Sequence, residues 1–117
     1  MPPSPAELLP ILAESWSLST GRHWLPERPA RGQCSVTALV VQDICGGEIL
    51  KTLTPGGWHF YNRIDGVRYD LTASQFDTPP DYADISSDMA EALADTSPEC
   101  YALLRRRVEA GLAALTH

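Results

Sequence analysis

Trp58-His-Phe-Tyr-Asn-Arg-Ile64 and Val67-Arg-Tyr-Asp-Leu-Thr72 flank the dipeptide Asp65-Gly66. Both runs are rich in aromatic and β-branched residues, which favour strands. Asp-Gly between two such runs is a strong signal for a hairpin with a two-residue turn. The stretch therefore predicts two antiparallel strands with Ile64 opposite Val67, and the rest of the fold is expected to pack around them.

The hairpin register places particular side chains on a common face. Counting back from the turn pairs Tyr61 with Asp70 and His59 with Thr72. Because side chains alternate between faces, these four point to one side of the sheet, and Asn62 points to the other. His59 and Asp70 are then diagonal neighbours with backbones roughly 7–8 Å apart. We expect a hydrogen bond between them, with Asn62 as the weaker candidate partner of the imidazole.

Residues 34–45, Cys-Ser-Val-Thr-Ala-Leu-Val-Val-Gln-Asp-Ile-Cys, are predicted to form a helix. Their β-branched content also allows a strand, but the length of the run and the following Gly46-Gly47 favour a helix. Apolar residues surround most of its circumference, which indicates a central, buried helix. Cys34 lies at its N-terminus, where the helix dipole favours the thiolate form of the side chain.

The remaining elements complete an α+β fold. Ser4-Pro5-Ala6-Glu7 has the pattern of a capping box and begins an N-terminal helix, which Pro10 should kink or shift. We predict a loop over 19–33, a strand over 48–53, a short helix over 88–94 and a final helix from Ser97. The expected fold is a small antiparallel sheet packed against the central helix that begins at Cys34, with N- and C-terminal helices.

Length and composition restrict the class of protein. A chain of 117 residues is expected to form a single domain, 1–117, with its core in 16–76 and a C-terminal helical part in 84–116. The net charge of −6 argues against a nucleic acid or an anionic membrane as partner. Three cysteines without a Cys-x-x-Cys pair predict no disulfide framework, and no secretory signal is evident, so a cytoplasmic location is expected. The oligomeric state stays open.

Cys34, His59 and Asp70 are the candidate catalytic residues. A histidine held by a carboxylate is what a helix-terminal thiol needs to act as a nucleophile. Two other interpretations remain: Cys34 as a small buried residue, and His59–Asp70 as a stabilising pair. The three side chains also suit zinc, but no compact ligand pair and no fourth ligand lie nearby in the sequence. We therefore predict no metal, and no cofactor, since no phosphate-binding glycine loop is present.

Three further residues are weaker candidates for contacts with a substrate or an oxyanion: Gln33, Asn62 and Trp58. The Gln33 amide would lie beside the backbone N–H of Cys34, a position suited to stabilising an oxyanion, although glutamine is also an ordinary loop residue. Tryptophans such as Trp58 are more often walls of a core or a cleft than partners of a cofactor.

Several motifs together resemble the YunG-like family of small bacterial proteins. The motifs lie within residues 31 to 76, roughly. They comprise residues 31–43, 46–50, 59–63, Asp65-Gly66, 70–72 and Gln75-Phe76. This resemblance implies no substrate.

More remotely, the order Cys, His, Asp on helix, strand and strand is similar to papain-like and transglutaminase-like enzymes. This similarity implies Cys34 as nucleophile, His59 as general base and Asp70 as the acid that orients the imidazole. An aspartate as the third residue, after the cysteine and the histidine, is closer to the transglutaminase-like pattern than to the papain-like one. The chain departs from these enzymes in its small size and in lacking a glutamine several residues before the cysteine.

The favoured hypothesis is a thiol-based acyl-transfer enzyme that acts on an amide or ester bond of a small molecule or peptide. Hydrolysis, deamidation and transfer to an amine are equally compatible with the residues. The alternative is a non-catalytic binding module that retains the architecture of a cysteine enzyme. An enzyme requires Cys34 to be accessible and close to His59, whereas a binding module requires neither.

Overall fold

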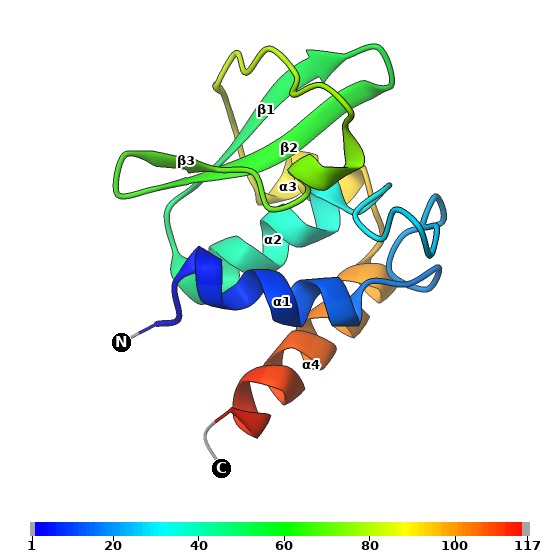
Figure 1. Cartoon of the computed structure of the whole chain (residues 1–117). Helices are drawn as coiled ribbons and strands as arrows, with labels where there is room; N and C mark the ends of the chain where they lie inside the picture. The colour runs from blue at the N-terminus through cyan, green and yellow to red at the C-terminus, as the bar shows by residue number, and fades with distance from the viewer. Residues whose placement is uncertain (1, 116–117) are drawn as a thin grey trace.

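A computed structural model describes residues 2–115. One antiparallel sheet has the strand order β3-β2-β1-β4, and the helices lie mainly on one side of it (Figure 1). The strands are β1 (Glu48–Thr54), β2 (Gly57–Ile64), β3 (Val67–Tyr69) and β4 (Ile85–Ser87). The helices are α1 (Pro5–Ser15), α2 (Cys34–Cys45), α3 (Met89–Ala94) and α4 (Pro98–Ala114), with a 3-10 turn, η1 (Ala73–Gln75). The predicted α+β class is confirmed.

Helix α2 occupies the centre of the molecule, between the sheet and the pair α1 and α4 (Figure 1). Residues 35–41 are all buried, as the apolar composition predicted. Val36 and Val40 pack with residues of α1 and α4, whereas Leu39 packs with Phe60 of the sheet. Helix α2 begins and ends at the predicted residues, so Cys34 is held at the edge of a tightly packed element.

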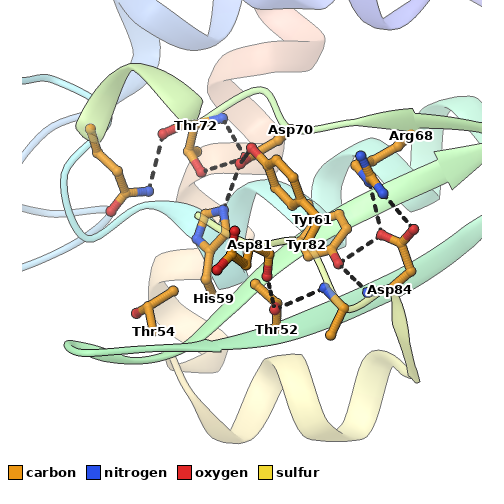
Figure 2. A network of polar contacts seen from close by, with 12 residues as sticks. Thr52, Thr54, His59, Tyr61, Arg68, Asp70, Thr72, Asp81, Tyr82 and Asp84 are labelled. Atoms are coloured by element: carbon orange, nitrogen blue, oxygen red, sulfur yellow. Dashed lines mark hydrogen bonds and ion pairs between the residues drawn. The ribbon is translucent and has the colours of Figure 1, made fainter. Parts of the chain in front are cut away.

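The hairpin forms with the predicted register. Asp65 and Gly66 both adopt positive φ, 50° and 79°, which a two-residue hairpin turn requires. Ile64 pairs with Val67, and Arg63 lies opposite Arg68. Arg63 forms an ion pair with Glu48. Arg68 forms one with Asp84 (Figure 2), so the two like charges are separately compensated.

The second hairpin strand is shorter than predicted. β3 ends at Tyr69, so the ladder expected between Tyr61 and Asp70 and between His59 and Thr72 does not form. Asp70 Oδ1 accepts hydrogen bonds from the N–H and the hydroxyl of Thr72, at 3.3 and 3.2 Å. This local side chain-to-backbone turn competes with strand pairing and turns the chain away from the sheet.

The chain that follows β3 covers the second face of the sheet (Figure 1). Phe60 and Asn62 of β2 point towards α2. Tyr61, on the opposite side of the strand, packs edge-on against Tyr82 and donates a hydrogen bond to Asp84. Both faces of β2 are therefore covered, and residues 59–62 are buried in succession.

The C-terminal part contains a strand that the sequence analysis did not predict. β4 pairs with β1, with Ile49 opposite Ser87, so helix begins only at Met89 within the predicted helical part 84–116. Position 116 lies outside the described residues. Leu104 and Val108 of α4 are fully buried. At the other end Ser4 and Glu7 form the predicted capping box, and Pro10 lies inside α1.

No helix within residues 2–115 has the length and apolar composition needed to cross a bilayer.

Candidate functional site

A cavity of about 990 Å³ opens at the N-terminus of α2. Its walls come from the loop before α2, the β1–β2 turn, the segment around η1 and the connection between α3 and α4. Cys34, Trp58, His59 and Phe76 line it. Cys34 is only partly buried, so its thiol is accessible from this cavity.

His59 and Asp70 form the hydrogen bond expected from the hairpin. His59 Nε2 lies 2.7 Å from Asp70 Oδ2, and the side chains are only 2% and 5% exposed (Figure 2). The bond forms although Asp70 lies beyond the end of β3, because the turn at Thr72 directs the carboxylate back over the sheet. Nδ1, on the other side of the imidazole ring, remains available for a second partner.

The carboxylate of Asp70 is held by more donors than the imidazole alone. Oδ2 also accepts a hydrogen bond from the hydroxyl of Tyr82 at 2.7 Å, and Oδ1 accepts two from Thr72 (Figure 2). A carboxylate that accepts several hydrogen bonds is fixed in orientation. Asp70 is therefore a rigid support behind His59.

The electrostatics of this group favour a protonated imidazole. Burial of the ring opposes the charge, but hydrogen bonds from His59 to Asp70 and to the Cys34 side chain, together with their charges, raise its pKa to about 9. The ring is consequently an imidazolium at neutral pH, between a carboxylate and a sulfur atom. An imidazolium beside a thiol stabilises the thiolate.

Aromatic rings fix the plane of the imidazole. Phe76 meets His59 edge-on, with ring centroids 4.8 Å apart and an interplanar angle of 87°. Tyr61 stacks at 5.9 Å and 23° on the same strand. With Nε2 held by Asp70, these contacts leave the ring little freedom to rotate.

The Gln33 side chain faces the loop before α2. Its Nε2 group donates to the carbonyl oxygens of Ser17 and Gly21, at 3.3 and 3.4 Å, and its Oε1 accepts from the Thr20 hydroxyl at 2.8 Å. Gln33 is fully buried. Both amide hydrogens are therefore used to hold residues 17–21 against the start of the helix.

Asn62 and Trp58 have different surroundings. Asn62 lies on the face opposite His59, as the register predicted, and donates to the carbonyl of Ala38 in α2 at 3.1 Å. Trp58 lines the cavity, is 44% exposed, and has the Lys51 ammonium 4.5 Å from the centre of its ring. The structure thus brings Cys34, His59, Asp70 and Trp58 together and uses the amides of Gln33 and Asn62 elsewhere.

Several residues of this region were not predicted from the sequence. Tyr82 holds Asp70, and Arg22 and Arg31 line the cavity. All three lie in stretches without helix or strand periodicity, so no pattern in the sequence connects them to Cys34. Within residues 2–115, no group of three or more His, Cys, Asp and Glu side chains is arranged to hold a metal ion.

Comparison with known proteins places the chain in a family. The model of the family described as "YunG protein" matches residues 4–113. The chain is 50% identical over 95 residues to "Uncharacterized protein YunG" of Bacillus subtilis (strain 168), covering 81% of this chain and 83% of that protein. No solved structure matches the chain significantly. From the extent of the family match and from this identity, the chain belongs to the YunG protein family.

Proposed function

We propose that this chain is a thiol-dependent acyl-transfer enzyme with a papain-like or transglutaminase-like core, acting on an amide or ester bond. The observation that carries the proposal is that a partly exposed Cys34 and a buried His59 line one cavity and interact, while Asp70 holds the imidazole from behind. The cavity volume of about 990 Å³ suits a small molecule or a peptide side chain.

In the first step the Cys34 thiolate attacks the carbonyl carbon of the substrate. The C–S bond forms, and the carbonyl oxygen takes the negative charge of a tetrahedral intermediate. His59, as imidazolium, then gives its proton to the departing amine or alkoxide, the bond to the leaving group breaks, and a thioester remains on Cys34. Asp70 keeps the ring oriented and stabilises its charge.

In the second step neutral His59 accepts a proton from water or from an amine, which attacks the thioester. Collapse of the second intermediate releases the acid or the new amide and returns the thiolate and the imidazolium. Backbone N–H groups in the first turn of α2 have no acceptor within the helix, so they are the donors proposed for the oxyanion. Trp58 supplies an apolar wall for the acyl group.

The test is the rate of alkylation by iodoacetamide against pH for each cysteine, read by peptide mass spectrometry. We expect Cys34 to react faster than Cys45 at neutral pH and to retain its rate below pH 7, because the imidazolium stabilises the thiolate. Cys45 is the internal reference, since burial raises the pKa of its thiol. In His59→Gln the advantage of Cys34 should fall by about tenfold or more.

The matched control is His23→Gln, which removes another histidine from the lining of the same cavity. This variant should leave the pH profile of Cys34 unchanged. A Cys34 profile that His59→Gln does not alter would contradict the enzymatic proposal and favour a binding module of the same architecture.

A further inference from the structure

Most Lys and Arg side chains of this acidic chain have a partner within the protein, but a few do not. The chain has nine Lys and Arg residues against fifteen Asp and Glu. Five of the nine form ion pairs with acidic side chains: Arg28, Lys51, Arg63, Arg68 and Arg105. Arg107 donates instead to the carbonyl of Ser15 and to the hydroxyl of Ser17.

The side chains of three arginines, Arg22, Arg31 and Arg106, have no hydrogen-bond or ion-pair partner within residues 2–115. Arg22 and Arg31 line the Cys34 cavity. Both are exposed, and neither guanidinium has an acidic partner within residues 2–115. The cavity lining contains one acidic residue, Asp95, against these two arginines. In a chain with an excess of acids, two uncompensated arginines at one cavity indicate a site for an anion.

The backbone brings Arg22 close to the start of α2. A Cβ atom added to Gly21 would lie 2.5 Å from both Gln33 Nε2 and the carbonyl oxygen of Gly32, and one added to Gly32 would lie 2.7 Å from the Cβ of His23. Residues 21–23 are therefore pressed against residues 32–33, immediately before Cys34. The Gln33 amide fastens the same contact by donating to Gly21. Arg31 precedes Cys34 by three residues on the adjoining segment.

We infer that Arg22 and Arg31 select an anionic substrate, and that the bond attacked by Cys34 belongs to an acyl compound carrying a carboxylate or a phosphate. This inference rests on the proposed function and adds the class of substrate to it. A guanidinium presents paired N–H donors that match the oxygens of either anion. The anion would be held beside the start of α2, and the acyl carbonyl would lie at Cys34 with Trp58 and Phe76 around its apolar part.

The test compares two alkylating agents that differ in charge: anionic iodoacetate and neutral iodoacetamide. The measured quantity is the ratio of their rates at Cys34 at low ionic strength. In Arg22→Gln/Arg31→Gln this ratio should fall about fivefold, because two nearby positive charges are lost. The matched control is Arg106→Gln, which removes the third unpaired arginine away from the cavity and should leave the ratio unchanged. An unchanged ratio in the double variant would overturn the inference.

If the double variant does not fold, the inference is tested on the wild type instead. The measured quantity is then how far an added compound slows the reaction of Cys34 with iodoacetamide, at matched ionic strength. Protection by succinate or inorganic phosphate, but not by uncharged succinamide, supports the inference, and the stronger of the two identifies the anion. Equal protection by all three, or by none, overturns it. This test can fail without the failure of the proposed function. The proposed function is tested by the rate of Cys34 with iodoacetamide and its loss in His59→Gln, whereas the inference is tested by the ratio of the rates with the two agents.

Discussion

The hydroxyl of Tyr82 and the carboxylate of Asp70 are joined by a hydrogen bond of 2.7 Å to Oδ2, the oxygen that also contacts His59 (Figure 2). Tyr82 lies in the segment that covers the outer face of the sheet, and Asp70 directly follows β3. Tyr82 and His59 thus contact the same carboxylate oxygen. The hydrogen bond from Tyr82 therefore affects the negative charge that Asp70 presents to His59.

Tyr82→Phe should therefore change both stability and titration. Loss of a hydrogen bond to a charged group is expected to lower the free energy of unfolding by about 1.5–3 kcal/mol. It should also raise the pKa of His59 further, because the carboxylate charge is then shared with one donor fewer. Urea unfolding and an NMR titration of the His59 ring measure the two effects. Tyr69→Phe is the control, since Tyr69 makes no hydroxyl hydrogen bond within residues 2–115, and an equal effect of both variants would contradict the assignment.

The pKa of His59 predicts a pH window for stability. Because its folded-state value of about 9 lies above the ordinary value of 6.5, the folded protein binds the proton more tightly than the unfolded chain does. The stabilisation is complete below about pH 6.5 and is lost as the pH rises through 9, a change on the order of 3 kcal/mol. Urea unfolding between pH 6 and 9 should show this decline in the wild type and a flatter profile in His59→Gln. Parallel profiles would refute the buried imidazolium.

Gln33→Ala distinguishes a role in holding the loop from a role in binding an oxyanion. It removes three hydrogen bonds and leaves the carbonyls of Ser17 and Gly21 without their donor in a buried position, so we expect a loss of about 2–4 kcal/mol in urea unfolding. Gln42→Ala removes a more exposed amide that donates to Gly47 and should cost less than about 1 kcal/mol. Unchanged stability with a loss of acyl transfer in Gln33→Ala would instead support the oxyanion role.

Gly32→Ala tests the close packing of the loop against the start of α2. Gly32 and Gly46 both have positive φ, 73° and 76°, so alanine is strained at both positions. A new Cβ would lie 2.7 Å from the His23 Cβ at Gly32, but within 4 Å of no atom at Gly46. Gly46→Ala should cost about 1–3 kcal/mol by chemical denaturation, from backbone strain alone, and Gly32→Ala about 1–3 kcal/mol more, because the new Cβ also overpacks against His23. Equal costs would show that the loop readily moves away.

Much of the fold was predictable because its signals are local. The Asp65-Gly66 turn determines the register between β2 and β3, which extends to Tyr69. The predicted contact of His59 with Asp70 forms through the turn at Thr72, beyond the end of β3. Helix α2 was predictable from its composition and from the glycines that follow it. Strand β4 was not predictable, because three residues with little alternation form a strand only when β1 presents an unpaired edge.

The amino-acid sequence by itself determined the helix that begins at Cys34, the hairpin and the side of the sheet on which His59 lies, because turn chemistry and side-chain alternation act between near neighbours. Only the tertiary structure decided that Tyr82 supports Asp70, that Gln33 is used to hold the loop, and that Arg22 and Arg31 line the same cavity. Those contacts join segments without periodicity across long separations, and their partners are selected by packing of the whole chain.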